Sequence, residues 1–545
     1  MPIPPDLDGP AAAALLALLP VLAPLLLLFA GFAAFAGPGL RSRAQVRAAE
    51  GAALLSLFAV LGAAGLAAFG AGEGLLPPAL APLKGLFMAD AVSLTMLLVV
   101  ASIGWAVLRF SASYLDGEAR QGSFTGWLCL TLASVLFFVQ AGTLSGLVLS
   151  WIAASLFLQK LLLFYPERLP ARRAARKHAL MARLSDGALI GAALLLYMAY
   201  GTQEIGALSA AARADFADGG GAALILAAGL LALAALFKSA QFPAHGWLTE
   251  VMDTPTPVSA LLHAGVVNAG GFLLIRFADV MLLAPGVLAA LVLIGGFTAL
   301  FGSLVMLTQP AVKTSLAWST IAQMGFMIFQ CGLALFPLAL LHIAAHSFYK
   351  AHAFLSSGSA VENVAAIKRP GPIAVPNGKA VGRSFLIALA IFAGTGAFFG
   401  FETKSPQAVA LGAILIFGVA YLLAQGLADA APRLLTQRTA LYSLAATAGY
   451  FTLQAGAEWL TAGTLPATPA PGPLEWALIT LAVLSFALTA FAQATFPLWS
   501  AHPAAAGSRA HLANGLYANA LFDRLLGSWQ VREQVSAGHP AAKKG

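Results

Sequence analysis

Long stretches without a single charged residue constrain this chain most. Examples are residues 11–28, 188–199 and 222–235. A helix needs about 20 apolar residues to cross the hydrocarbon core of a bilayer, and hydrocarbon is the solvent that tolerates such runs. Only 10% of the 545 residues are charged and 60% are hydrophobic, whereas a soluble domain carries about 25% charged residues. The sequence therefore predicts an all-α polytopic membrane protein and excludes a soluble enzyme.

The remaining composition excludes several further classes of protein. The net charge of +8 does not indicate a nucleic-acid-binding protein, because the basic residues are spread over many short loops. Cys129 and Cys331 lie far apart in apolar runs, which predicts two buried thiols and no disulfide framework. Tetrahedral zinc needs four converging ligands, and the sequence offers no such set. We therefore expect no metal and no other cofactor in this chain.

The apolar pattern also predicts the topology. Applying the length of a spanning helix along the chain gives about fifteen candidate spans. Basic residues gather in alternate loops, and the loops between them are neutral or acidic, so the N-terminus is predicted outside (periplasmic) and the C-terminus in the cytoplasm. The candidate spans lie near residues 11–36, 51–70, 91–110, 124–140, 146–165, 179–200, 221–243, 257–278, 286–307, 312–331, 334–357, 383–402, 407–427, 438–455 and 475–498. The basic loops lie at 41–47, 168–177, 368–379, 433–438 and in the tail 509–544.

Three ionisable residues follow one another inside a predicted span. His342, His346 and Lys350 are spaced i, i+4, i+8, so they lie along one face of a helix. Charged groups at bilayer depth are costly and mark functional sites by default, and imidazole titrates near neutral pH. The spacing predicts a ladder that passes protons through intervening waters. The alternative is that each group is a satisfied structural partner in helix packing.

A second polar segment follows the uncharged run that ends at residue 237. Lys238 is predicted deep in the membrane, and Pro243 then breaks the helix. Pro255 and Pro257 interrupt the next segment before His263 returns an ionisable group to the same depth. Broken helices at membrane depth persist only where they are buried in protein or line a wet cavity. The pattern therefore predicts an ion site at this break.

Four further charged residues lie within or close to the predicted spans. Lys160 and Lys404 fall within or at the edge of apolar spans, and both are candidates for the pathway. Glu250 and Asp253 are expected at the cytoplasmic surface, and the alternative to a functional role is that both are solvated loop carboxylates.

Several long motifs in the chain resemble a known family of membrane subunits. The motifs are FMADAVSLTMLLVV and FSASYL, then KSAQFPAHGWLTEVMDTPTPVSALLHAGVVNAGGFLLIR, then VKTSLAWSTIAQMGFM and LHIAAHSFYKAHAFLSSGS. In this order, from about residue 88 to 360, they resemble the antiporter-like subunits of respiratory complex I, Mrp-type sodium/proton antiporters and membrane-bound hydrogenases.

The resemblance implies a fold and a set of site residues. It implies two inverted five-helix repeats with discontinuous helices, at 124–278 and 279–430. N-terminal helices would occupy 1–123, C-terminal helices 431–500 and a cytoplasmic tail 501–545. Lys238 matches the central lysine of the family, and the residues that connect it to the second repeat match His263, His342, His346 and Lys350. In the family, protons or sodium ions move along this polar axis.

The chain departs from the family pattern in two places. The fifth span of relatives has a glutamate after a tryptophan, which pairs with the central lysine; here Ile152 follows the tryptophan, and Lys160 lies two turns further along. We therefore expect Lys238 to lack its countercharge. In the second repeat, GAFFGFETKSP is the nearest counterpart of the family's charged turn and offers Glu402 and Lys404.

The short tail and the lost glutamate resemble one branch of the family, the DabB-type subunits of inorganic-carbon pumps. That resemblance implies a DabA-like cytoplasmic partner similar to a zinc-dependent β-carbonic anhydrase, in a bacterial inner membrane, and an H+ or Na+ current through this chain. The resemblance leaves two alternatives open. One is an ion-translocating subunit of a hydrogenase, a quinone oxidoreductase or an Mrp-type antiporter, and the other is a non-conducting anchor.

Overall fold

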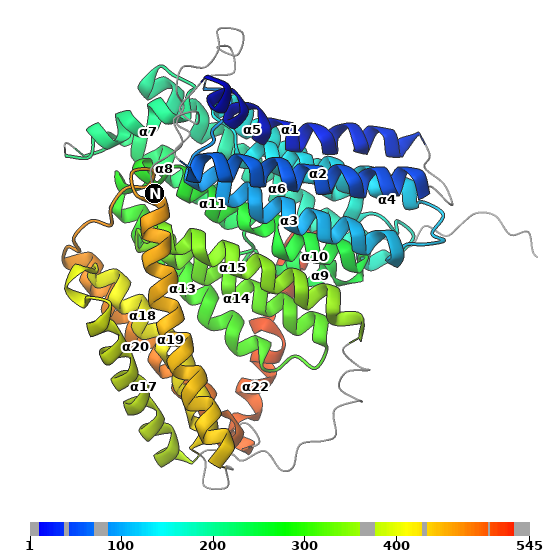
Figure 1. The fold of residues 1–545 in the computed structure, drawn as a ribbon. Helices are drawn as coiled ribbons and strands as arrows, with labels where there is room; N and C mark the ends of the chain where they lie inside the picture. Colours follow the sequence, from blue (N-terminus) through cyan, green and yellow to red (C-terminus); the bar gives the residue numbers. More distant parts are fainter. Residues whose placement is uncertain are drawn as a thin grey trace, which may run out of the picture.

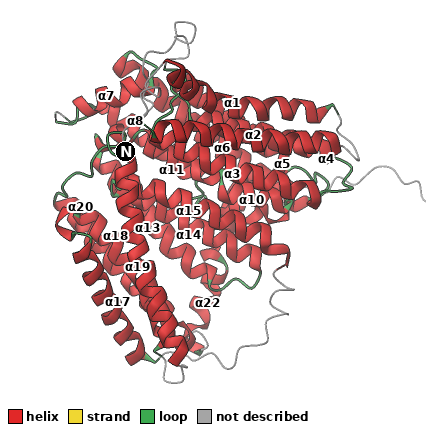
Figure 2. Ribbon diagram, viewed as in Figure 1, coloured by secondary structure: helices red, strands yellow, loops and turns green. Residues whose placement is uncertain are grey.

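The computed structural model describes residues 10–36, 43–69, 85–217, 219–359, 377–427, 433–499 and 502–527. Within these residues every regular element is a helix and no strand is formed (Figure 1, Figure 2). The long helices are α1 (Pro10–Phe35), α2 (Arg43–Ala68), α3 (Ala91–Tyr114), α4 (Gln121–Val139), α5 (Leu144–Leu162), α6 (Leu169–Tyr200), α8 (Ala222–Lys238), α13 (Pro285–Met306), α14 (Val312–Gly332), α15 (Phe336–Leu355), α17 (Gly378–Phe398), α18 (Pro406–Gly426), α19 (Arg433–Thr461) and α20 (Pro473–Ala494). The short segments that position the site are α7 (Ile205–Ala214), α9 (Gly246–Glu250), α10 (Thr256–Ala264), η3 (Val266–Asn268), α11 (Ala269–Arg276), α12 (Ala278–Leu282), η5 (Phe401–Thr403), α22 (Ala506–Ala513) and α23 (Ala518–Leu526).

The predicted membrane spans all coincide with helices, so the prediction of an all-α polytopic membrane protein is confirmed. In the described residues ten helical stretches are long and apolar enough to cross a membrane, with α10 to α11 forming one of them. Helix α8 and the first part of α18 are shorter apolar helices. Helices α14, α15 and α19 are long but more polar, and α15 carries the predicted ladder.

Helices that follow one another in sequence pack side by side. Helix α1 contacts α2 and α4, α6 contacts α8, and α13 contacts α14. Small residues permit the last contact, because a Cβ on Gly295 would lie only 2.7 Å from the carbonyl oxygen of Gly325. One continuous apolar core extends from α1 to α15, and a smaller one around Phe392 and Phe451 joins α17, α18 and α19, which stand together at the lower left of Figure 1.

The predicted helix break near Pro243 is present. Helix α8 ends at Lys238 and α9 begins at Gly246, so the chain is non-helical in between. A second interruption separates α10 from α11 at Gly265. The hydroxyl of Ser239 donates to the carbonyl oxygen of Val267 at 2.7 Å, which ties the two breaks together. Polar groups of the broken segments thus find partners inside the protein, as a break at membrane depth requires.

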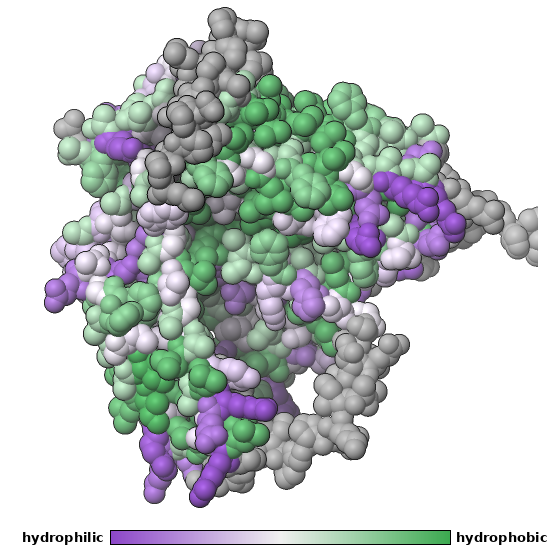
Figure 3. Space-filling view, in the orientation of Figure 1, coloured by the Kyte–Doolittle hydropathy of each residue, from purple (hydrophilic) through white to green (hydrophobic). Residues whose placement is uncertain are grey.

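The charges are segregated toward the ends of the helices. On the face shown in Figure 3, the hydrophilic side chains gather at the helix ends and the hydrophobic ones cover the lengths between them. The start of α6 and the C-terminal helix α23 lie at the same end, because Lys177 forms an ion pair with Asp523. The two basic segments that the topology prediction put on one side are therefore on one side of the structure.

Candidate functional site

Lys238 occupies the last position of α8 and is 5% exposed. Its Nζ donates to the Ser155 hydroxyl at 2.5 Å and lies 4.5 Å from the centre of the Trp151 ring. Trp151 and Ser155 are one turn apart on α5, so a single face of that helix receives the lysine. The free carbonyl groups at the C-terminus of α8 also favour a cation at this position.

A carboxylate of α6 also acts on the lysine. Asp186 lies in the buried part of α6 and forms an ion pair with Arg183 at 2.9 Å, and both charges interact electrostatically with Lys238. Lys238 forms no ion pair in the described residues, so the family's paired carboxylate on α5 is missing as expected, and the negative charge that acts on Lys238 comes from a different helix. Ile152 is half-buried on α5 between the two residues that contact the lysine. The signal for Asp186 was available in the sequence: it is a carboxylate inside a predicted span.

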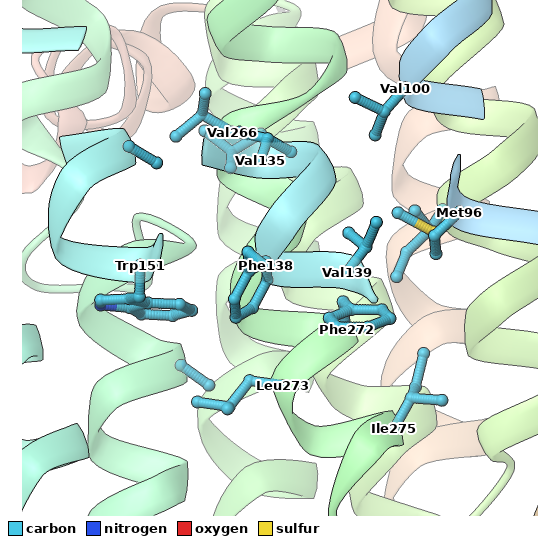
Figure 4. Packing of buried hydrophobic residues seen from close by; sticks show 14 of the residues in the cluster. Met96, Val100, Val135, Phe138, Val139, Trp151, Val266, Phe272, Leu273 and Ile275 are labelled. Atoms are coloured by element: carbon cyan, nitrogen blue, oxygen red, sulfur yellow. The ribbon is translucent and has the colours of Figure 1, made fainter. Parts of the chain in front are cut away.

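Aromatic side chains close this site on one side. Trp151 packs against Phe138 at 5.2 Å between ring centres, and Phe138 packs against Phe272 at 5.2 Å (Figure 4). Val139 and Met96 continue the apolar layer in the same view. Such packing leaves little room for water beside the lysine, so its charge depends on the few polar partners described above.

The predicted ladder lies on α15 as its spacing required. His346 and Lys350 are buried, and His342 is half-buried. The Nδ1 of His342 lies 2.8 Å from Oε1 of Gln330, and the rings of His342 and His346 are 6.0 Å apart. Lys350 donates to the carbonyl oxygen of Leu316 at 3.0 Å. No carboxylate is among these partners, so the ladder is a buried row of basic groups.

His263 joins the ladder from α10. Its ring stacks on Phe354 with centres 4.3 Å apart, and its Nδ1 lies 3.1 Å from the Thr320 hydroxyl. The carbonyl oxygen of His263 is 3.2 Å from Nε2 of His346, and the Lys350 charge acts on both imidazoles. The structure therefore brings four of the five principal predicted residues into one cluster.

Polar atoms occupy the space between this cluster and the helix breaks. The Asn268 amide donates to the Ser347 hydroxyl at 2.8 Å, and these two residues help to line a cavity of about 20 Å³. The rest of its lining is apolar, so the cavity is large enough for one water molecule but offers it few polar partners. The Nε2 of His263 and Oδ1 of Asn268 are buried without a hydrogen-bond partner in the described structure, and of these two residues only Asn268 lines the cavity.

The other predicted pathway residues lie away from this cluster. Lys160 is exposed at the end of α5, 5.9 Å from the Trp127 ring, and about 13 Å along the helix from Trp151. Glu402 is exposed on η5. Lys404 forms an ion pair with Glu458 of α19 at 2.7 Å. The prolines lie as predicted, with Pro255 directly before α10 and Pro257 in its first turn.

A buried ion cluster was not predicted from the sequence. Lys177, assigned above to a basic loop, is 1% exposed and forms ion pairs with Glu250 and Asp523. Asn519 of α23 accepts from Lys177 at 3.0 Å and donates to Glu250 at 2.8 Å. Lys177 therefore lies in a helix and not in a loop, and the solvated alternative for Glu250 is wrong, because the C-terminal helix covers both residues. Only tertiary packing reveals this.

Ion pairs also fix the other end of the bundle. Arg276, at the end of α11, contacts Asp90 at 2.5 Å, and Arg213 holds Asp279 through two hydrogen bonds of 3.1 Å. Burial alone would raise the pKa of Asp90, but the Arg276 guanidinium and the hydrogen bonds from Arg276 and Ser93 hold that pKa below its ordinary value of 3.8. Asp90 also caps α3, so the charge pair joins two helices.

Comparison with known proteins identifies the family. Residues 141–404 match the family model described as NADH:quinone oxidoreductase/Mrp antiporter, TM, and residues 83–125 match NADH-Ubiquinone oxidoreductase (complex I), chain 5 N-terminus. The chain is 37% identical over 458 residues to the probable inorganic carbon transporter subunit DabB2 of Halothiobacillus neapolitanus, which covers 83% of this chain and 82% of that protein. The chain belongs to the antiporter-like membrane subunits, in their DabB branch.

Other relatives match about half of this DabB-type chain, and a solved structure matches nearly all of it. The probable inorganic carbon transporter subunit DabB of Hydrogenovibrio crunogenus is 44% identical over 280 residues, about half of each chain (50% and 52%). NADH-quinone oxidoreductase subunit L of Escherichia coli is 36% identical over 273 residues, 50% of this chain and 44% of that protein. The structure of the Mrp complex from Dietzia sp. DQ12-45-1b has the same fold, with a TM-score of 0.53 and 22% identity over 97% of this chain and 61% of that one.

Proposed function

We propose that this chain is the ion-conducting membrane subunit of an energy-coupled inorganic carbon transporter. The match to DabB2 over 83% of the chain carries this proposal. The buried cluster of His263, His342, His346 and Lys350 supports conduction, since a membrane protein pays several kcal/mol to keep such groups from water and keeps them where they work.

The geometry suggests how a proton moves along this cluster. Imidazole accepts a proton on one nitrogen and donates from the other, so His342 and His346 can each receive and pass on a proton through a water. Lys350 sits one turn further along α15 and can hold the proton as an ammonium. Lys238 forms a separate station, and the Asp186 carboxylate acts on it electrostatically. Sodium ions are the alternative cargo in this scheme.

The ion gradient would drive the partner reaction. We propose a DabA-like cytoplasmic partner, similar to a zinc carbonic anhydrase, whose zinc would supply the hydration of CO2 by water to bicarbonate and a proton. A membrane potential of 100 mV is worth about 2.3 kcal/mol per charge, which biases such an equilibrium by a factor of tens. We place this chain in the bacterial inner membrane with a periplasmic N-terminus and a cytoplasmic C-terminus, as the loop charges indicate.

The test measures CO2-dependent uptake of inorganic carbon by cells that express both subunits. The complex is purified from the same cells. Replacing Lys350 or His346 by alanine should abolish uptake at normal membrane abundance, because each change removes a proton station and leaves the span. Exposed Lys379, changed to alanine, is the matched control and should have little effect. Full uptake with both site variants would favour the non-conducting anchor.

A second candidate function has its own support. Subunit L of complex I is 36% identical over the same region, and it belongs to an oxidoreductase by its name. If iron–sulfur or nickel–iron subunits co-purify with this chain in place of a zinc protein, it works in a redox complex and the carbon-transport proposal fails.

A further inference from the structure

The C-terminal helices α22 and α23 lie across the ends of other helices. Helix α22 contacts α13, and Gln309, just after α13, donates to the carbonyl oxygen of Ala513 at 3.2 Å. Helix α23 contacts α9, where a Cβ on Gly246 would lie 2.0 Å from Oδ1 of Asn519. The turn between α22 and α23 rests on α14, because a Cβ on Gly515 would lie 3.1 Å from the Trp318 ring. The segment therefore covers the end of α13 and the starts of α14 and α9.

One face of α23 makes its contacts with the bundle. Asn519 donates to Glu250 at 2.8 Å, and Asp523 forms an ion pair with Lys177. Phe522 packs against the apolar core. Two polar residues and one large apolar side chain thus fix this inner face.

The other face of α23 and the turn before it are apolar and exposed. Leu521 and Leu525, one turn apart, are 57% and 84% exposed, and Leu516 and Tyr517 in the turn are each 43% exposed. Both turn residues have a positive φ, 51° and 59°, which is unfavourable for a residue with a Cβ. An exposed apolar patch indicates an interaction site, and leucines one turn apart are typical anchors of a helix that enters an apolar groove. We name Leu516, Tyr517, Leu521 and Leu525 the outward face.

Burial within the chain does not account for these two helices. They have 8 and 9 residues, and isolated helices shorter than about 12 residues are marginal in water. Helix α22 buries none of its residues. A second surface that covers the outward face would supply the missing burial.

The polarity of α23 argues against lipid as this second surface. A helix that lies on a membrane carries basic residues on its polar face and buries its apolar face in the bilayer. The polar face of α23 carries Asn519 and Asp523 instead, and both are bound to the protein. Its contacts are with helix ends, where the bundle does not face hydrocarbon.

Position and charge favour a cytoplasmic protein. The segment lies at the end of the bundle that holds the start of α6, which we place in the cytoplasm from the loop charges. Arg524 is exposed beside Leu521 and Leu525, whereas the neighbouring carboxylates of Glu250 and Asp523 are both bound to Lys177. A complementary surface is therefore apolar at its centre and acidic at its rim.

We propose that the outward face is the docking site of the cytoplasmic partner subunit, which covers it with an apolar groove rimmed by carboxylates. This inference rests on the proposed function, because that proposal supplies the partner. Helix α23 then lies between the partner and the segment that follows the helix break, since its inner face contacts Gly246 and Glu250 of α9. Docking would hold α9 in the position that the structure shows.

The first test places a charge on the outward face. Truncating one central apolar anchor of an interface weakens binding about 30-fold, and a charge there is worse, so Leu521→Glu should lower the amount of co-purifying partner by about tenfold or more. Phe216→Glu is the matched control, because Phe216 is 48% exposed near the start of α13, at the opposite end of the bundle, and should leave the amount unchanged. Trypsin should cleave the isolated Leu521→Glu chain after Arg524 at the wild-type rate, which shows that α23 remains on the bundle.

The outcomes separate this inference from the proposed function. Wild-type amounts of partner with Leu521→Glu would overturn the docking site. Lys350→Ala should keep the partner and lose uptake, so it reports on ion conduction alone. Loss of uptake by Lys350→Ala, with full retention of the partner by Leu521→Glu, would leave the proposed function intact and remove only this inference.

The second test identifies what covers the outward face. Both native cysteines are fully buried, so Leu525→Cys supplies the accessible thiol of the described residues. After labelling with benzophenone maleimide and irradiation of membranes that contain both subunits, peptide mass spectrometry should find the adduct in the partner. Adding Leu521→Glu should reduce that adduct about tenfold. Adducts only with lipid, or only with a second copy of this chain, would overturn the inference, as would a thiol that the reagent cannot reach in the isolated chain.

Discussion

Removing Lys177 should release the C-terminal helix α23 from the bundle. The Lys177 side chain is 1% exposed, and its partners Glu250 and Asp523 are 25% and 17% exposed. Loss of one partner from a buried ion pair costs about 3–5 kcal/mol, and the remaining water contact of the two carboxylates reduces our expectation for Lys177→Ala to about 2–4 kcal/mol. A change of 2 kcal/mol raises the undocked population of the helix about 30-fold.

Limited proteolysis of the detergent-solubilised protein measures this population directly. Trypsin cleaves after Arg524, within α23, only when that helix leaves its site, so Lys177→Ala should be cut about 30-fold faster than wild type at low protease. Gly246→Ala provides a second variant with all charges intact, because a Cβ there would lie 2.0 Å from Oδ1 of Asn519. Lys379→Ala should not change the rate. Equal cleavage of Lys177→Ala and wild type would refute the reasoning.

Three further predictions concern charge and metal content. Ile152→Glu should lower uptake, because a second carboxylate beside Lys238, added to Asp186, would hold its proton more tightly; a fully active variant would contradict this. Asp90 has a lowered pKa in the folded chain, so its pair with Arg276 contributes stability above the unfolded value near 3.8 and loses it as the pH falls through the folded value. The melting temperature of wild type should therefore exceed that of Asp90→Asn at about pH 6, and the difference should shrink as the pH falls below the unfolded pKa and through the lower folded pKa. The purified chain without its partner should contain no stoichiometric zinc by elemental analysis; no group of three metal-ligating side chains occurs in the described residues.

The sequence predicted the helices, which local residue patterns determine. It missed the contacts that depend on how distant helices pack together. Apolar runs of spanning length fix the helices, and the i, i+4, i+8 spacing of His342, His346 and Lys350 fixes their common face. Pairing across helices depends on which faces meet, so the contact of Lys404 with Glu458 could not be derived from either segment alone. The same reason explains Lys177, since its burial depends on a helix more than three hundred residues away in sequence.

Sequence identity with relatives located Lys238 but misjudged its surroundings. The missing glutamate after Trp151 predicted a lysine without a countercharge, because the family motif covers only that position on α5. In the structure Ser155 on α5 accepts a hydrogen bond from the lysine, and Asp186 on α6 acts on it electrostatically. A charge can thus be balanced from a different helix while the position that relatives use becomes apolar.

The polarity of α15 has a consequence for how the chain enters the membrane during synthesis. A lysine at the centre of a spanning segment adds about 2.5–3.5 kcal/mol to its insertion into lipid. Helix α15 carries Lys350 in its last third together with His342 and His346, so the lysine adds less than this but still opposes insertion. If it left the translocon alone, this helix would insert poorly into the lipid bilayer. Its contacts with α10 and α14 offer the imidazoles and the ammonium a polar lining, so α15 would leave the translocon as part of a group of helices. The buried basic residues proposed to conduct ions thus make insertion of α15 depend on when the helices that contact it are synthesised.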